Sequence, residues 1–287
     1  MYLTTEISSK DLYGPFGRGG LCSGHVADDW TPVRSAFEEN FALNYELGAQ
    51  LVIYDGEDMV VNLSGKSSKQ KIYSEDSLQN IFSSGKNMEA VCMAVLVDRG
   101  LLAYDDLVIK HWPEFGKNGK ESVTIADVLR HEGGVPFFSD CGDLKDGKRD
   151  TRLTREHFAD KDALDRVIEN SGKYNVHSKR HYHACTRGWL LSGIIRRVDK
   201  RGRTLGQFMR DEVCAPFGLD IFCGMEPALQ HKHEFADVQD ISLPYMLSHC
   251  IAPAVLGVGD PTIRAVVDGL KANFDIINRH STPCTLC

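Results

Sequence analysis

The chain has 287 residues, of which 42% are hydrophobic, so it is long enough and apolar enough to bury a core. Its formal net charge is −7 and its lysines and arginines form no large block, which argues against nucleic acid as a partner. It contains no apolar run of about eighteen residues, and its first residues resemble neither a secretory signal nor an arginine-rich presequence. Nine cysteines without a regular spacing suit a reducing compartment, so we expect a cytoplasmic protein that does not enter a membrane.

The N-terminal part of the chain predicts a loop, a helix and a hairpin, in that order. Glycines between residues 1 and 25 predict an irregular, flexible lead-in: Gly14, Gly17, Gly19 and Gly20. Residues 29–44 have the spacing of an amphipathic helix with one buried face: Val33, Phe37, Phe41 and Leu43. Apolar residues on both sides of Asp55-Gly56, between 46 and 65, predict a β-hairpin.

The rest of the chain is predicted to be mainly helical. A helix that begins near Lys86 ends at Gly100, and helical patterns dominate from 107 to about 219, interrupted by a polar loop at 141–152. A further helix is predicted at 262–277, followed by a tail without strand pattern. We expect one domain with a sheet and nucleophile-helix lobe at 26–106, a helical lobe at 107–225 and an atypical C-terminal part at 226–287. A basic run is interpreted as a solvated helix end: Arg196, Arg197, Lys200, Arg201 and Arg203.

Ser83 and Lys86 lie three residues apart at the start of the predicted helix, so one helical turn places both side chains on one face. A serine hydroxyl becomes a nucleophile when a neighbouring group takes its proton, and a lysine in a pocket can do so. Apolar residues follow Lys86 at helical spacing, which indicates a core behind it: Met88, Val91, Cys92, Val95 and Leu96. The Ser83 N–H would lie at the positive helix end, where it would help to stabilise an oxyanion.

Other candidate groups have weaker contexts. Ser68 has the same spacing to Lys71, but no apolar helix follows it, so this copy is interpreted as a turn or a strand end. Cys92 lies on the apolar stripe of the helix, and buried thiols are usually inert. The aromatic residues of the helical lobe are expected to pack in its core rather than line a substrate cleft: Trp112, Phe115 and Trp189.

Four segments in a fixed order carry a resemblance to a known family. They are the hairpin at 46–65, the stretch from Ser83 to 106, the run at 112–135 with Trp112-Pro113-Glu114-Phe115 and His131-Glu132-Gly133-Gly134, and the stretch at 181–191 that begins His181-Tyr182-His183-Ala184. Over roughly residues 20–225 the chain resembles the serine β-lactamase and penicillin-binding-protein-like family, especially class C-like esterases and animal β-lactamase-related proteins. The resemblance implies an α+β fold of the β-lactamase/transpeptidase type, with an antiparallel, incomplete sheet packed with helices and an all-α lobe.

The resemblance implies that Tyr182 acts as general base or proton relay beside Ser83 and Lys86. The family's motif is Tyr-x-Asn, and Ala184 stands here in place of the asparagine. Esterase-like branches often lack that asparagine, so the departure favours acyl transfer from esters over β-lactam hydrolysis. The implied activity is hydrolysis of a small ester or amide through an acyl-serine intermediate, without a metal or organic cofactor.

One motif of the family is not found in this sequence, namely a lysine- or histidine-led triplet with glycine on a late strand. Two triplets match this motif in residue type, Lys117-Asn118-Gly119 and Lys145-Asp146-Gly147. Both lie in polar loops before the stretch at 181–191 that contains Tyr182. In the family that strand supplies a second N–H to the oxyanion, and losing such a donor costs about a hundredfold or more in rate. The alternative hypothesis is therefore a truncated, inactive member that binds a partner or self-associates through an unpaired sheet edge.

Two His-x-His pairs and a terminal Cys-x-x-Cys have metal-like spacing without a complete ligand set: His181 and His183, His231 and His233, Cys284 and Cys287. We expect the first pair to orient the Tyr182 loop and the second to lie in an exposed loop. His131 precedes Gly133 at a predicted helix end and is interpreted as a capping residue. These patterns predict neither a metal site nor a redox site.

Overall fold

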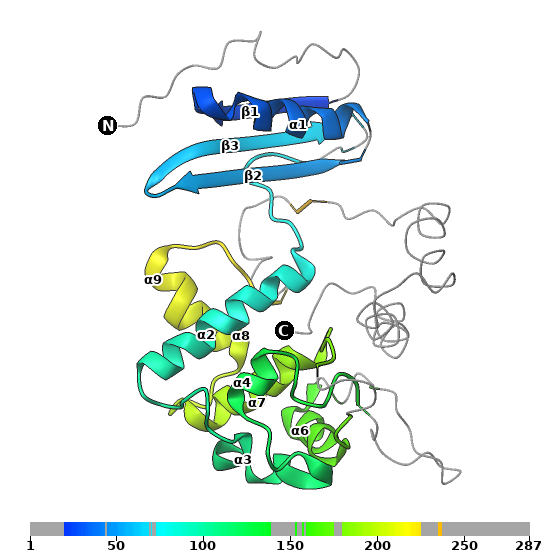
Figure 1. Cartoon of the computed structure of the whole chain (residues 1–287), viewed down its shortest axis with the longest axis vertical. Coiled ribbons are helices and arrows are strands. Elements are labelled where there is room, and N and C mark those ends of the chain that lie inside the picture. The colour runs from blue at the N-terminus through cyan, green and yellow to red at the C-terminus, as the bar shows by residue number, and fades with distance from the viewer. Residues whose placement is uncertain are drawn as a thin grey trace, which may run out of the picture. The chain divides into compact units, whose positions relative to one another are not determined.

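The computed structural model describes residues 20–43, 45–68, 70, 73–138, 153, 157, 159–174, 180–224 and 235–236. These residues form two compact units, which we call the sheet unit (20–81 with 235–236) and the helical unit (82–224). Figure 1 shows the elements of each. Several predictions fall outside the described residues: those for Gly14, Gly17 and Gly19, for the loop 141–152 with Lys145-Asp146-Gly147, for His231 and His233, and for the C-terminal helix, tail and cysteines.

The sheet unit contains an antiparallel sheet of β1 (Gly20–Val26), β2 (Gly48–Asp55) and β3 (Asp58–Ser67), in the order β1-β3-β2. β2 and β3 pair as a hairpin, and Gly56 in the turn between them has a φ of 62°, a conformation that favours glycine. The predicted hairpin is confirmed. Ser68 follows the last residue of β3, which agrees with its interpretation as a strand end.

β1 corrects the prediction of an irregular lead-in, which is wrong for residues 20–25 because β1 pairs with β3 along its length. Gly24 permits this pairing. Its φ is 114°, and a Cβ atom at this position would lie 1.9 Å from the carbonyl oxygen of Asn62 in β3. A glycine in this segment therefore marks a close approach of two backbones rather than a flexible loop.

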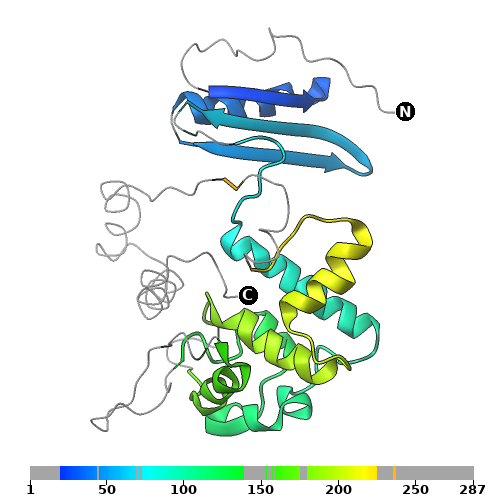
Figure 2. The ribbon, with the colours of Figure 1, turned by 180° about the vertical axis from the view of Figure 1, so that it is seen from behind.

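A 3₁₀ turn, η1 (Asp28–Trp30), leads into α1 (Thr31–Ala42), which lies along one face of the sheet (Figures 1 and 2). Phe37 and Phe41 of α1 are buried against Val61 and Leu63 of β3. The two phenyl rings pack edge to face with centroids 5.3 Å apart. Leu43, predicted on the buried face, is exposed, because a position two residues after Phe41 lies about 200° further around the helix.

The helical unit confirms the predicted helical region. Its elements are η2 (Phe82–Gly85), α2 (Lys86–Asp98), α3 (Val108–His111), η3 (Pro113–Gly119), α4 (Ile125–Leu129), α6 (Lys161–Asn170), α7 (Thr186–Val198), α8 (Leu205–Met209), the π-helical turn η4 (Arg210–Cys214) and α9 (Ala215–Phe217). The triplet Lys117-Asn118-Gly119 lies in η3, so it is not on a strand. α2 ends as predicted, because Gly100 has a φ of 66° and its N–H bonds to the carbonyl of Val97 at 2.9 Å.

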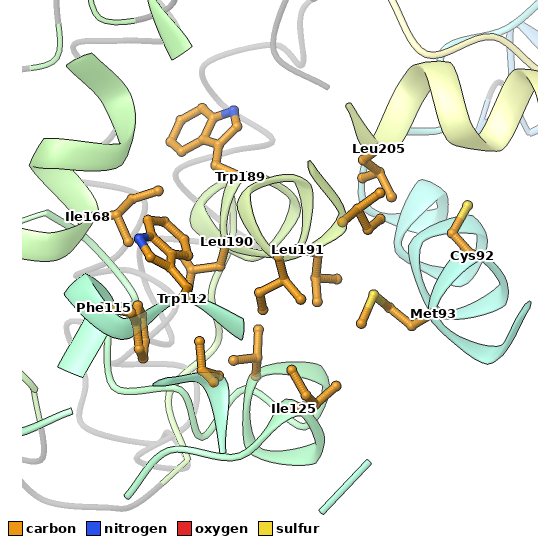
Figure 3. Close-up of a cluster of buried hydrophobic side chains, with 14 of the residues drawn as sticks. Cys92, Met93, Trp112, Phe115, Ile125, Ile168, Trp189, Leu190, Leu191 and Leu205 are labelled. Carbon is orange, nitrogen blue, oxygen red and sulfur yellow. The ribbon is translucent and has the colours of Figure 1, made fainter. Parts of the chain in front are cut away.

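The core of the helical unit surrounds α7 (Figure 3). Leu190 and Leu191 of α7 are fully buried, with Cys92 and Met93 of α2 in the same cluster. Trp112, Phe115 and Trp189 are buried there too, which confirms their packing role. α2 was expected in the sheet lobe at 26–106, but in the structure it belongs to the helical unit, because its buried face packs on α7 and α8.

Cys92 is an inert thiol rather than a rival nucleophile. Its side chain is fully buried, and this burial raises the pKa of the Cys92 thiol to about 12. The thiolate, which is the reactive form, is therefore not populated near neutral pH. The prediction made from its place on the apolar stripe is confirmed.

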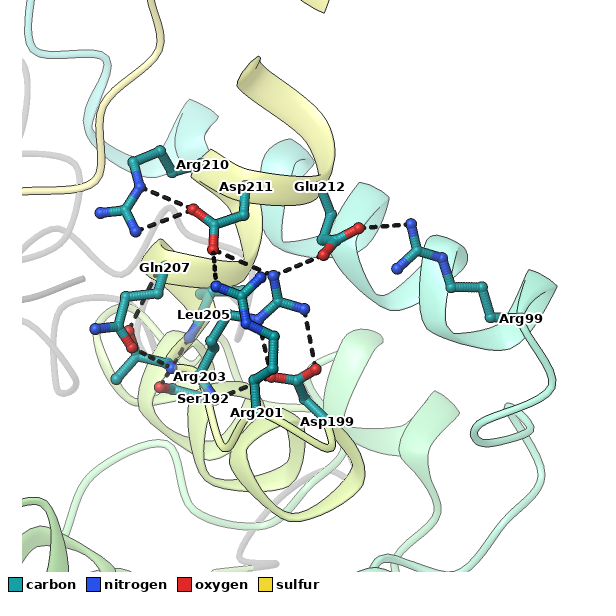
Figure 4. A network of polar contacts seen from close by, with 11 residues as sticks. Arg99, Ser192, Asp199, Arg201, Arg203, Leu205, Gln207, Arg210, Asp211 and Glu212 are labelled. Atoms are coloured by element: carbon teal, nitrogen blue, oxygen red, sulfur yellow. Dashed lines mark hydrogen bonds and ion pairs between the residues drawn. The ribbon is translucent and has the colours of Figure 1, made fainter. Parts of the chain in front are cut away.

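Arg203 lies in a cluster of charged side chains that joins the loop after α7 to η4 (Figure 4). Its guanidinium lies 2.9 Å from Asp199, 3.2 Å from Asp211 and 2.6 Å from Glu212. Hydrogen bonds from Arg203 lower the pKa of Asp199 to about 2. The interpretation as a solvated helix end is wrong for Arg203, because three carboxylates allow this cation to be buried.

Replacing Arg203 with methionine removes the cation that these three carboxylates share. We expect the free energy of unfolding to fall by about 3–5 kcal/mol, since breaking a buried ion pair leaves uncompensated charge. Arg201→Met is the matched control, because Arg201 is 66% exposed and its contact with Asp211 is 3.3 Å long. The control should cost less than about 1 kcal/mol. Denaturant unfolding followed by circular dichroism compares the two variants, and equal losses would contradict the role of burial.

Candidate active site

Ser83 and Lys86 lie together where η2 passes into α2. Ser83 is in η2 and exposed, whereas Lys86 is the first residue of α2 and is half-buried. Lys86 Nζ donates a hydrogen bond to Ser83 Oγ at 3.4 Å. The structure therefore brings together the two side chains whose spacing predicted a shared helical face.

The tyrosine segment, residues 181–184, contacts Lys86 from far along the chain. Lys86 Nζ donates to the carbonyl oxygen of Ala184 at 2.6 Å and lies 5.2 Å from the centre of the Tyr182 ring. Lys86 thus contacts both Ser83 and the Tyr182 ring within the helical unit. Because the Ala184 contact uses a main-chain oxygen, an asparagine side chain at this position is not needed to hold the lysine.

His131 supports the tyrosine segment from the end of α4. Its φ is 64° and its N–H bonds to the carbonyl of Val128 at 3.2 Å, so the predicted capping role is confirmed. The imidazole also contacts the tyrosine segment, which the capping pattern does not indicate. The imidazole packs on the Tyr182 ring with centroids 4.7 Å apart, and its Nδ1 accepts the N–H of His183 at 3.0 Å.

His183 fixes the same segment from its buried side. Its Nε2 accepts the N–H of Val135 at 3.1 Å, which assigns the proton to Nδ1, and Nδ1 donates to the carbonyl of His181 at 2.6 Å. Burial lowers the pKa of His131 to about 3 and the pKa of His183 to about 4. Both rings are therefore neutral at pH 7, as their acceptor roles require, and these contacts agree with the expected orienting role of His183.

The neutral histidines make the stability of the fold depend on pH. The folded-state pKa values of His131 and His183 lie below the unfolded value of 6.5, so protonation favours the unfolded chain. Their contribution is present above pH 6.5 and is lost as the pH falls, down to about 4 for His183 and about 3 for His131. We expect a slope of up to about 1.4 kcal/mol per pH unit for each ring. Urea unfolding between pH 6.5 and 5 measures it, and a His183→Gln variant with an unchanged slope would contradict this assignment.

Among the residues that the structure describes, no group of three histidine, cysteine, aspartate or glutamate side chains has a geometry that could hold a metal ion. Within the same residues, no helix combines the length and the apolar character needed to cross a membrane.

The family model named Beta-lactamase matches residues 35–222 of the chain. The chain belongs to the beta-lactamase family. This match confirms the resemblance based on the four segments, and solved structures confirm the α+β fold of the β-lactamase/transpeptidase type. Ser83, Lys86 and Tyr182 all lie within the matched residues of this beta-lactamase family member.

Relatives of this family member include esterases. The esterase/beta-lactamase LipL of Mycobacterium tuberculosis (strain ATCC 25618 / H37Rv) is 32% identical over 184 residues, which are 63% of this chain and 40% of LipL. A penicillin-binding protein homologue from Caulobacter crescentus has 32% identity and a TM-score of 0.65, and the match covers 77% of this chain and 57% of that one. A family VIII carboxylesterase has 28% identity and a TM-score of 0.64, with coverage of 76% and 57%. The chain thus spans less than two thirds of the length of each of these relatives.

Proposed function

We propose that this protein is a serine hydrolase that cleaves a small ester or amide, with Ser83 as the nucleophile. The observation that carries the proposal is the hydrogen bond of 3.4 Å between Lys86 Nζ and Ser83 Oγ, beside the Tyr182 ring. The names of two relatives, an esterase/beta-lactamase and a carboxylesterase, support the same reaction class. Membership of the family supports the acyl-serine chemistry.

In the first half of the proposed reaction, Ser83 Oγ attacks the carbonyl carbon of the substrate. Its proton passes to the pair formed by Lys86 and Tyr182, and the carbonyl oxygen becomes an oxyanion that the Ser83 N–H stabilises. When the oxyanion collapses, the bond to the alcohol or amine breaks. The leaving group takes the proton that Ser83 released, and an acyl-serine remains.

In the second half, water replaces the leaving group. Lys86 and Tyr182 take a proton from the water, whose oxygen attacks the acyl carbon, and the bond between that carbon and Ser83 Oγ breaks. The proton returns to Ser83 Oγ, so the enzyme is restored and the carboxylic acid leaves. Lys86 Nζ is placed for this exchange, because it faces Ser83 Oγ at 3.4 Å, is held by the Ala184 carbonyl at 2.6 Å and lies 5.2 Å from the centre of the Tyr182 ring.

Ala184 supports a preference for esters over β-lactams. Its methyl group offers no hydrogen bond to a substrate, whereas an asparagine of the family's Tyr-x-Asn motif carries a donor and an acceptor. The main-chain oxygen of Ala184 is already bonded to Lys86 at 2.6 Å. A substrate amide at this place would therefore lack a side-chain partner.

Hydrolysis of short p-nitrophenyl esters and of a chromogenic cephalosporin tests the proposal, with the Ser83→Ala protein as the background. We expect ester hydrolysis by the wild type above that background, and cephalosporin hydrolysis at the background rate. A folded wild-type protein that cleaves no ester faster than Ser83→Ala would contradict the reaction, and equally rapid cleavage of the cephalosporin would contradict the preference.

A further inference from the structure

Arg187 lies in the first turn of α7, three residues after the tyrosine segment, and its guanidinium bonds to two other helices. Nε donates to Glu89 Oε2 of α2 at 2.7 Å, and Nη2 donates to the main-chain carbonyl of Lys86 at 2.5 Å. Nη1 donates to the carbonyl of Leu129, the last residue of α4, at 3.2 Å. One side chain thus fixes the start of α2, the end of α4 and the start of α7 relative to one another.

The ion pair of Arg187 and Glu89 is buried, with 8% and 13% of the two side chains exposed. Such a pair contributes little net stability compared with apolar residues of similar volume, but the planar guanidinium imposes a definite geometry on its partners. The next residue, Gly188, leaves room for the carboxylate, because a Cβ atom there would lie 2.8 Å from Glu89 Oε1. Two adjacent residues of α7 are therefore fitted to the first turn of α2.

Lys86 is held at both of its ends by this part of the chain. Its main-chain carbonyl accepts from Arg187, and its Nζ donates to the carbonyl of Ala184. A shift of the first turn of α2 along α7 would move Lys86 Nζ relative to Ser83 Oγ and Tyr182 at the same time. Displacements of about 1 Å in a catalytic group can cost about 10²-fold in rate.

We propose that Arg187 and Glu89 are positioning residues, which fix the first turn of α2 so that Lys86 Nζ lies between Ser83 Oγ and the Tyr182 ring. This inference rests on the proposed function of Ser83. Neither residue needs to touch a substrate, because both act through the backbone of α2.

Labelling of the full chain by a fluorophosphonate probe tests this role, with the affinity for the probe and the maximal rate of the covalent step measured separately. In Arg187→Met we expect the maximal rate to fall about 10²-fold and the affinity to stay unchanged, because only the proton-transfer geometry is disturbed. Arg196→Met is the matched control. Arg196 lies in the same helix and also forms a little-exposed ion pair, with Asp165 at 2.6 Å, and its loss should leave labelling unchanged.

Three further tests distinguish a positioning role from a merely structural effect. Arg187→Lys retains a cation for Glu89 but lacks the planar guanidinium that also donates to the Lys86 carbonyl. We therefore expect about a tenfold lower maximal rate in a folded protein. In a Glu89→Gln background, Arg187→Met should cost less than in the wild type, because the two residues act as one unit. Millimolar guanidinium should restore part of the labelling rate in Arg187→Ala and none in Arg196→Ala.

The possible results separate this inference from the proposed function. If the wild type is labelled at Ser83 but Arg187→Met and Arg187→Lys react as fast as Arg196→Met, the positioning role is overturned and the nucleophile stands. If the folded wild type is not labelled at Ser83, the proposed function itself is overturned. A drop in probe affinity with an unchanged maximal rate would also overturn the inference, because it would place Arg187 in substrate binding.

Discussion

Replacing Ser83 with alanine is expected to lower ester hydrolysis by about 10⁴-fold or more, to the uncatalysed background, because the acyl group then has no oxygen to attach to. Ser84 provides a matched control. It is the next residue of η2 and is also exposed, but the hydrogen bond from Lys86 Nζ goes to Ser83 Oγ. Ser84→Ala should therefore retain activity within about a factor of three.

Steady-state hydrolysis of a p-nitrophenyl ester measures both variants, with circular dichroism as the check that each is folded. Activity that survives in Ser83→Ala, or that is lost equally in Ser84→Ala, would show that another group is the nucleophile. Since η2 is short and both side chains are exposed, neither change should disturb the core.

Replacing Lys86 with methionine is expected to lower the rate by about 10²- to 10⁴-fold, the range typical of a lost proton-transfer group. Methionine keeps the length and packing of the side chain but makes neither the bond to Ser83 Oγ nor the one to the Ala184 carbonyl. Tyr182→Phe removes only the phenolic hydroxyl and keeps the ring against His131, so its effect reports proton transfer rather than packing.

Lys86 and Tyr182 should behave as one unit in these measurements. The double variant is expected to be little slower than Lys86→Met alone, because each single change already breaks the proton path. Lys110→Met is the control for removing a lysine, since Lys110 is 61% exposed and pairs with Asp106. Rates that multiply independently in the double variant would contradict a shared proton path.

Local sequence signals were sufficient for the helix that carries Lys86. Its start is indicated by the serine-lysine spacing, its buried stripe by apolar periodicity and its end by Gly100, which needs a positive φ. The hairpin was predictable for the same reason, because a turn between two apolar runs is a short-range pattern. The family resemblance added Tyr182, which spacing alone does not connect to Ser83.

Contacts between distant segments were not predictable from these patterns. Pairing of β1 with β3 depends on the close approach of Gly24 to the backbone of Asn62. The local sequence does not indicate this pairing, because a glycine-rich segment is typical of a loop. The packing of His131 on Tyr182 and the bonds of Arg187 to α2 join residues about fifty to a hundred positions apart. Nothing in the local periodicity of either partner identifies the other, so these supporting residues emerge only in three dimensions.

Mapping the site of fluorophosphonate attachment would decide whether Ser83 is the nucleophile. The probe forms a bond between phosphorus and the reactive oxygen and releases fluoride, so peptide mass spectrometry locates it at single-residue resolution. We expect the adduct on Ser83, and strongly reduced attachment in Lys86→Met, whose lysine bonds to Ser83 Oγ in the wild type. An adduct on another residue, or no adduct on the folded wild-type protein, would contradict a serine-lysine nucleophile.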